Sequence, residues 1–499
     1  MALYSERVGC WAGIIKKGAM VKYVLLLLLA AMGNAVCCMA ESPDEFIFSY
    51  SDLVKQIQVV APELPATEGL DGAAQAMRFP ILDQQSVFNG FTAKSLTEKL
   101  SEIKESAGRT TKRRAEISYL FADLKYDGEH LKILELGEGK NGGFRSFDAI
   151  FEEGRIWKGF WKYATSLGLP VFYVGPGPSN DPINKIGISL NEKIAWPDFM
   201  EKSGLWAWSL YELKARPYFQ ALANAERSGD GSGVQDYKAI IVYKYRDDRE
   251  PSHLRALEKF KKDYPDFLVL DCASRPFAAS KQLNDILFRS SEETAVFRPA
   301  CKLYPKRYES GLAKQILSDI GGEFFVIKPV DSGMSNGVIM TSREHLDADL
   351  RRILTARVVY NHSHPTTFNY RPTDTQSYSY WFGDTNKQFI VEAFAPSRTI
   401  TVLGKKYDPT IRAVFALVHD KDAIKVKFFE HWWKLAPKGL DEYSILTLKH
   451  ISQYRPDLKQ LPAKELTLSD ADERGMRSIM AGAMARAYVK MLVLENDKS

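Results

Sequence analysis

The segment spanning residues 324–340 constrains the fold more than any other, because it combines two apolar stretches with a short polar loop between them. Phe, Val and Ile favour a buried, pleated backbone, so each apolar stretch predicts a β-strand. Lys328 lies near the end of the first strand, and Ser332, Gly333 and Gly337 lie in the loop region. Glycine allows successive backbone N–H groups to face an anion, and a lysine adds positive charge beside them. The sequence therefore predicts a hairpin that holds a phosphate group.

Two other interpretations of this hairpin stay open. Residues 333–337 match the G-x-S-x-G pattern of hydrolases, which would make Ser335 a nucleophile. That pattern needs a helix directly after the turn, whereas the apolar residues from Val338 onward favour a strand. The other interpretation is an ordinary hairpin whose lysine lies at the surface. The segment lacks the glycine patterns of P-loop and dinucleotide-binding proteins.

A second hairpin is predicted upstream, over residues 122–136. An Asp-Gly turn at 127–128 separates two strand-like arms, which carry Asp123 and Glu135. Paired carboxylates suit Mg²⁺, a hard cation that prefers oxygen ligands and shares them with nucleotide phosphates. Two alternatives are solvated hairpin carboxylates and, for residues 133–139, the first strand and glycine turn of a methyltransferase. The strand predicted at 170–174 lacks the acidic end that a methyltransferase site would need.

The phosphate hairpin resembles the glycine-rich element of ATP-grasp enzymes. The strand predicted at 388–394 resembles their adenine-binding strand, with Glu392 as its acidic residue. Because the carboxylate pair precedes the phosphate hairpin, the order of motifs resembles that of circularly permuted members such as glutathionylspermidine synthetase. Residues 297–302, including Lys302, also resemble the stretch before the hairpin in those relatives. The resemblance covers most of residues 115–440.

This resemblance implies a circularly permuted ATP-grasp-like α/β fold that binds ATP and Mg²⁺. The protein would activate a small-molecule or peptide carboxylate as an acyl phosphate, which an amine then attacks. Lys302 and Lys328 would hold phosphates, Asp123 and Glu135 would hold the metal, and Arg412 would neutralise developing charge. Arg412 lies at the start of a predicted strand, and a surface salt bridge is its alternative role.

Two positions depart from the pattern of those relatives. Gly137 stands where they carry an asparagine, two residues after the metal-binding glutamate, and Phe121 stands where they carry an arginine. Glu138 and Asn141 are candidates to replace the asparagine. The departures favour an alternative function, a non-catalytic module that binds a nucleotide or peptide.

The N-terminus is predicted to be a secretory signal peptide or a membrane anchor. Three lysines precede a leucine run, and small residues at 35–40 suit cleavage. Export conflicts with the use of ATP, which is scarce outside the cytoplasm, and a non-functional signal would leave the protein cytoplasmic. Cleavage near Ala40 would leave Cys272 and Cys301, enough for one disulfide at most.

The remaining sequence predicts layers of helices and strands. Strands at 170–174, 239–243 and 267–270 alternate with helical patterns such as 252–262, which predicts a parallel α/β layer. The expected segments are a signal peptide or anchor (1–40), a helical N-terminal region (41–114), the metal-binding half of the ATP-grasp fold (115–168), an α/β domain (169–295), and the phosphate- and adenine-binding half (296–499).

Composition narrows the classes of partner. A hydrophobic content of 45% supplies ample core, and 67 basic against 62 acidic residues, dispersed along the chain, give no support for a nucleic-acid partner. Membrane contact is expected through the N-terminal segment only. His362 and His364 lie in a polar loop, where an exposed loop is favoured over metal ligation.

Overall fold

The computed structural model describes residues 44–56, 114–141, 147, 151, 154–175, 205–226, 229–244, 251–330, 337–355, 380–381, 386–436, 439–440 and 467–496. Several predictions lie outside these residues: the signal segment 1–40, loop residues Ser332, Gly333 and Ser335, and His362 and His364. Within the described ranges, no helix combines the length and apolar character needed to cross a membrane.

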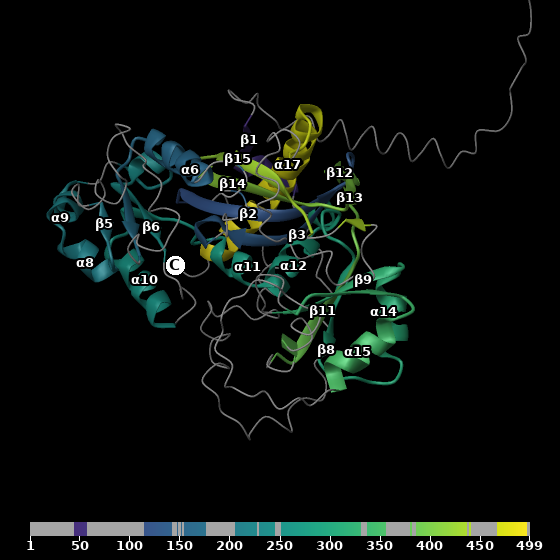
Figure 1. The fold of residues 1–499 in the computed structure, drawn as a ribbon. Coiled ribbons are helices and arrows are strands. Elements are labelled where there is room, and N and C mark those ends of the chain that lie inside the picture. Colours follow the sequence, from purple (N-terminus) through teal and green to yellow (C-terminus); the bar gives the residue numbers. More distant parts are fainter. Residues whose placement is uncertain are drawn as a thin grey trace, which may run out of the picture.

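A five-stranded antiparallel sheet forms the centre of the molecule, in the order β1-β15-β14-β2-β3 (Figure 1). One face packs on the long helix α17 and on α2, α11 and α12, and the other face packs on α6. Because both faces are covered, β14 is apolar along most of its length rather than alternating. The elements are β1 (Glu45–Ser49), α2 (Tyr50–Gln56), β2 (Glu116–Tyr126), β3 (Leu131–Glu138), α6 (Arg155–Ser166), α11 (Arg275–Ala279), α12 (Lys281–Arg289), α13 (Glu292–Ala295), β14 (Thr410–Asp420), β15 (Ala423–Lys434) and α17 (Asp470–Asn496).

The predicted phosphate hairpin is present in a four-stranded antiparallel sheet, here called the small sheet, in the order β10-β9-β11-β8. Two helices, α14 and α15, cover one of its faces. Because a strand follows Gly337, the strand, turn and helix that a hydrolase nucleophile needs are not formed here. The elements are β8 (Cys301–Pro305), α14 (Leu312–Ile320), β9 (Phe324–Pro329), β10 (Ile339–Ser342), α15 (Leu346–Thr355) and β11 (Gln388–Ala393).

Gly337 is required by its conformation and by its surroundings. Its φ angle is 71°, a left-handed value that glycine adopts without strain. A Cβ atom there would lie 2.6 Å from Pro329 and 2.7 Å from Tyr380. The indole N–H of Trp381 donates to the carbonyl oxygen of Gly337 at 2.7 Å, which holds the end of the loop against the sheet.

The predicted parallel α/β layer is confirmed in the order β5-β4-β6-β7. Figure 1 shows this layer on one side of the central sheet and the small sheet on another. Its elements are β4 (Val171–Val174), β5 (Trp206–Ala207), α8 (Leu210–Ala215), α9 (Pro217–Asn224), β6 (Ala239–Tyr243), α10 (Pro251–Asp263) and β7 (Phe267–Val269). Two short strands, β12 (Ile400–Val402) and β13 (Lys405–Tyr407), form a separate hairpin.

Two expectations need correction. The N-terminal region, residues 41–114, was expected to be helical, but β1 extends the central sheet by pairing with β15, and only α2 follows it in the part described, which ends at residue 56 before Arg114. Phe46 and Phe48 explain this strand, because they pack against the core on the α17 side. The methyltransferase interpretation also fails, since β3 is an edge strand of an antiparallel sheet.

Candidate functional site

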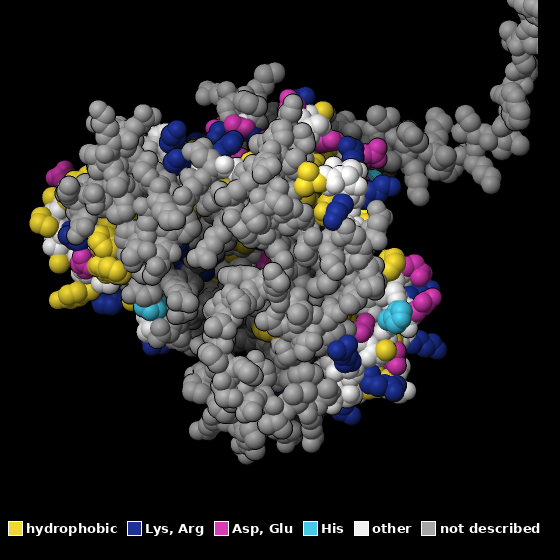
Figure 2. All heavy atoms as spheres, viewed as in Figure 1, with side chains coloured by type: hydrophobic (Ala, Val, Ile, Leu, Met, Phe, Trp, Pro, Cys, Tyr) yellow, Lys and Arg dark blue, Asp and Glu magenta, His cyan; other side chains and the backbone are white. Residues whose placement is uncertain are grey.

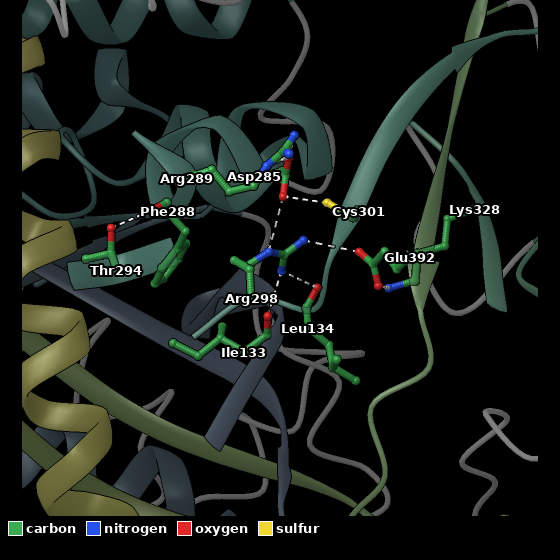
Figure 3. A network of polar contacts seen from close by, with 10 residues as sticks. All are labelled: Ile133, Leu134, Asp285, Phe288, Arg289, Thr294, Arg298, Cys301, Lys328 and Glu392. Carbon is green, nitrogen blue, oxygen red and sulfur yellow. Dashed lines mark hydrogen bonds and ion pairs between the residues drawn. The ribbon is translucent and has the colours of Figure 1, made fainter. Parts of the chain in front are cut away.

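The side chain of Arg298 joins the small sheet to the central sheet (Figure 3). Its Nη1 donates to the carbonyl oxygens of Ile133 at 2.7 Å and Leu134 at 2.8 Å, both on β3. Its Nη2 donates to Glu392 of β11 at 3.1 Å. Only 3% of Arg298 is exposed, so these contacts take the place of water at Nη1 and Nη2.

Glu392 also holds the predicted phosphate lysine. Its second carboxylate oxygen accepts from Nζ of Lys328 on β9. Burial alone would raise the pKa of the Glu392 carboxyl, but Lys328 and Arg298 together lower this pKa below its ordinary value. Glu392 is therefore an internal anion held between two cations.

The other end of this network is Asp285 on α12. It accepts from Nε of Arg289 at 2.8 Å and from Sγ of Cys301 at 2.7 Å, and it lies 3.5 Å from Nε of Arg298. Burial, with Asp285 adding to its effect, raises the pKa of the Cys301 thiol well above the usual value. Cys272 and Cys301 are both free thiols, so they do not form the disulfide that the sequence allowed. We call the set Asp285, Arg289, Arg298, Cys301, Lys328 and Glu392 the Arg298 network.

The Arg298 network reaches β3 at a β-bulge. Asp123 pairs with Glu135 across β2 and β3, but the next pair is Leu124 with Ile133, so Leu134 is the extra residue. A bulge bends its strand and redirects the neighbouring side chains. Because Arg298 binds the carbonyl oxygens of Ile133 and Leu134, it fixes the backbone immediately before Glu135.

Asp123 and Glu135 lie opposite one another, as predicted for the upstream hairpin. Asp123, however, is bound by two cations of neighbouring strands. Nε and Nη2 of Arg412 donate to its two oxygens at 2.7 and 2.8 Å, and Nζ of Lys434 donates to one of them at 2.8 Å. Burial opposes ionisation, but Arg412 and Lys434 outweigh it and hold the pKa of Asp123 far below its ordinary value.

The two positions at which the sequence departs from the permuted ATP-grasp pattern contact each other. Phe121 is paired with Gly137 across β2 and β3. A Cβ atom at Gly137 would lie 2.1 Å from Cζ of Phe121, so the ring occupies the space of the missing side chain. The guanidinium of Arg412 lies 4.0 Å from the centre of the same ring. We call Phe121, Asp123, Glu135, Arg412 and Lys434 the Asp123 cluster.

Glu138, a candidate to replace the missing asparagine, belongs to another environment. Successive residues of a strand face opposite sides of the sheet, so Glu135 and Gly137 share a face that Glu138 does not. Glu138 instead lies 3.8 Å from Lys140 and 3.7 Å from Arg275 on α11. The side chain of Asn141, the other candidate, lies outside the described residues.

Lys302 and Lys328 are not brought together. Val391 is paired with Lys302, whereas its neighbour Ile390 is paired with Lys328, so the two lysines lie on opposite faces of the small sheet. Lys302 is on the face that α14 covers, and it pairs there with Asp319 at 3.1 Å. Its predicted role as a phosphate ligand beside Lys328 therefore finds no support in this register.

The Asp123 cluster does not fit the expected Mg²⁺ ion in this arrangement. Both oxygens of Asp123 already accept hydrogen bonds from cations, and Glu135 is the only other carboxylate of the cluster. Magnesium requires oxygen ligands in near-octahedral geometry. Across the described ranges, no group of three or more His, Cys, Asp or Glu side chains stands in a position to hold a metal ion.

Four charged contributors were not assigned from sequence: Asp285, Arg289, Arg298 and Lys434. Arg298 lies in the stretch 297–302, whose resemblance to ATP-grasp enzymes is a signal for this arginine as well as for Lys302. Lys434 follows two tryptophans at the end of β15, and Trp432 is buried in the core. On the face seen in Figure 2, acidic and basic side chains are interspersed on the described surface.

Comparison with known proteins does not assign the chain to a family. No protein-family model matches the chain, and no curated protein matches it. Similar solved structures include a glutathione synthetase-like effector from Globodera pallida, with 10% identity and a TM-score of 0.31 over 71% of this chain and 81% of that one. Another is a putative gamma-glutamylcysteine synthetase from Methylobacillus flagellatus, with 12% identity and a TM-score of 0.31 over 84% of this chain and 96% of that one. Likenesses at this TM-score establish neither a shared fold nor a shared function.

Proposed function

We propose that the protein binds ATP between the small sheet and β3 and acts as an ATP-dependent ligase, joining a carboxylate to an amine through an acyl phosphate. The observation that carries the proposal is the continuous set of contacts from Lys328 through Glu392 and Arg298 to the backbone beside Glu135. These contacts hold the hairpin that carries Lys328 at a fixed distance from a second group of cations, Arg412 and Lys434 of the Asp123 cluster. Such pre-positioned charge is what phosphoryl transfer mainly requires from a protein.

Lys328 is the proposed phosphate ligand. In the Arg298 network, three cations face two carboxylates, so the network carries an excess positive charge that an anion would neutralise. A phosphate oxygen would compete with Glu392 for Nζ of Lys328, and Glu392 would keep its contact with Arg298. Arg412 would then neutralise the charge that develops on the phosphoryl group as it passes from the nucleotide to the carboxylate.

A non-catalytic nucleotide-binding protein is the second candidate. The contact between Phe121 and Gly137 favours it, because both residues replace polar groups of the ligases that the sequence resembles. Release of ADP on addition of carboxylate and amine mixtures separates the two candidates. Binding of ATP without any ADP release supports the binding protein.

The test of ATP binding uses two lysines on opposite faces of one sheet. Lys328→Met should weaken ATP binding by at least about tenfold, because a charge-assisted contact with phosphate is lost. Lys302→Met removes the same charge from the other face and should change the affinity by less than about twofold. Isothermal titration calorimetry measures both variants. Equal affinities for wild type and Lys328→Met would overturn the site.

A further inference from the structure

The oxygens of Asp123 are already committed to side-chain cations. One oxygen accepts from Nε of Arg412, and the other accepts from both Nη2 of Arg412 and Nζ of Lys434. Asp123 is 5% exposed, so these donors stand where water or a metal ion would otherwise bind. A divalent ion would have to displace them and lie against two positive charges, which Coulomb repulsion opposes.

The neighbouring residues do not complete a metal site either. Gly137 offers no side chain, and the Phe121 ring fills the space beside it. Glu138 faces the opposite side of the sheet and is engaged by Lys140 and Arg275. Glu135 therefore remains as the second carboxylate on this face of β2 and β3. Because the cations already bind Asp123, the two carboxylates together supply few oxygens to a metal.

The same cations are suited to an oxyanion. Arg412 uses Nε and Nη2 on Asp123, which leaves Nη1 outside that contact, and Lys434 uses one of the three N–H groups of its ammonium. Each side chain is 12% exposed, so neither is fully closed off from solvent. The Phe121 ring supports the guanidinium from one side and restricts its orientation.

We infer that Arg412 and Lys434 take the place of a divalent metal at Asp123, so that this cluster binds a nucleotide phosphate oxygen without any metal ion. The inference rests on the proposed ATP-binding function for the identity of the anion. Asp123 then acts as a positioning residue, because it holds two cations at a fixed spacing. Fixed cations of this kind stabilise phosphate charge, as a bound metal ion does elsewhere.

Calorimetry with ATP tests the inference in buffer containing EDTA and in buffer containing Mg²⁺. Wild type should bind ATP with affinities within about threefold of each other in the two buffers. Lys434→Met should bind at least about tenfold more weakly in EDTA and should recover part of the loss in Mg²⁺, because it removes one positive charge and frees one acceptor position on the Asp123 oxygen that Nη2 of Arg412 still binds. Binding by wild type that requires Mg²⁺ would overturn the inference.

A matched control lies on the same strand. Lys425, also on β15, pairs with Asp420 at 3.0 Å, and Lys425→Met removes the same charge far from Asp123. This variant should match wild type in both buffers. Circular dichroism of each variant confirms that the fold is retained.

A second measurement does not depend on ATP. Mn²⁺ prefers the same carboxylate ligands as Mg²⁺ and can be followed by electron paramagnetic resonance. Wild type without nucleotide should leave Mn²⁺ free, and a bound signal that Glu135→Gln abolishes would overturn the inference. If wild type fails to bind ATP in either buffer, the proposed function fails, and the Mn²⁺ titration still decides whether the Asp123 cluster holds a metal.

Discussion

The Arg298 network and the Asp123 cluster are both buried groups of charges, but they are built differently. The Arg298 network draws its side chains from α12, β8, β9, β11 and the segment before β8, and it ends on the backbone of β3. The Asp123 cluster lies on adjacent strands of one sheet, whose backbone hydrogen bonds already fix the spacing. Side-chain contacts therefore determine the geometry of the Arg298 network. The backbone determines that of the Asp123 cluster, so the donors of Arg412 and Lys434 that Asp123 does not use remain available for binding.

The largest expected effect is the loss of Arg298. Arg298→Met leaves Asp285 and Glu392 each with one cation fewer and removes the donor of two β3 carbonyl groups. Breaking a buried ion pair from one side costs about 3–5 kcal/mol of unfolding free energy. Urea denaturation measures this change.

Arg289 provides the matched comparison. Its side chain is 31% exposed and binds the same Asp285, but Arg289→Met leaves the connection between the sheets intact. It should cost about 1 kcal/mol. Similar costs for the two arginines would show that Arg298 does not hold the sheets together.

The sequence predicted the parts of the site that depend on local patterns. The strand, loop and strand around Lys328 follow from β-forming residues and glycines, and the Asp-Gly turn places Asp123 opposite Glu135. Lys302 could not be assigned to a face in this way. Its face depends on the register of β8 against β11, and a shift of one residue reverses the face.

Lys434 illustrates a second limit. Counting back from the turn between β14 and β15 would place His431 opposite Arg412, with Lys434 on the other face. A register shift between Val414 and Phe415 instead places Trp432 opposite Arg412, and Lys434 then shares the face of Arg412. A bulge of this kind depends on tertiary packing, so hydrophobic patterning alone does not reveal it.

The second prediction concerns acid stability and the Asp123 cluster. Because Arg412 and Lys434 hold the pKa of Asp123 below its unfolded value of about 3.9, its ion pairs stabilise the fold above that pH. The contribution is lost as the pH falls below the unfolded value toward the folded one. Asp123→Asn should therefore cost about 1.5–3 kcal/mol at neutral pH.

Denaturation at two pH values separates this charge effect from a packing effect. Between about pH 6 and about pH 3, wild type should lose more unfolding free energy than Asp123→Asn, because the variant has no carboxylate to protonate. Asp347→Asn removes an exposed partner of Arg351 on α15 and should change stability by less than about 0.5 kcal/mol. The same pH dependence in wild type and Asp123→Asn would contradict the assignment.

The smallest expected effect concerns the contact between Phe121 and Gly137, where the ring fills the space that a metal-binding side chain would need. Gly137→Ala places a methyl group 2.1 Å from Cζ of Phe121, so the ring must move, and its contact with Arg412 is disturbed. Overpacking of this size should cost about 1–2 kcal/mol of unfolding free energy. Gly159→Ala is the control, because a Cβ there meets its nearest neighbour at 3.7 Å inside α6, where alanine favours the helix.

A double-mutant cycle shows whether Phe121 is the cause. If the ring alone excludes a side chain at Gly137, then Gly137→Ala should be less costly in a Phe121→Ala background, with a coupling energy of about 0.5–1.5 kcal/mol. Equal costs in both backgrounds would mean that the backbone of β3, rather than the ring, requires glycine. Since the ring also supports Arg412, Phe121→Ala should loosen the guanidinium without breaking its two hydrogen bonds to Asp123. The cluster would then keep its charge but lose part of its fixed orientation, which is the property that distinguishes a built anion site from an ordinary salt bridge.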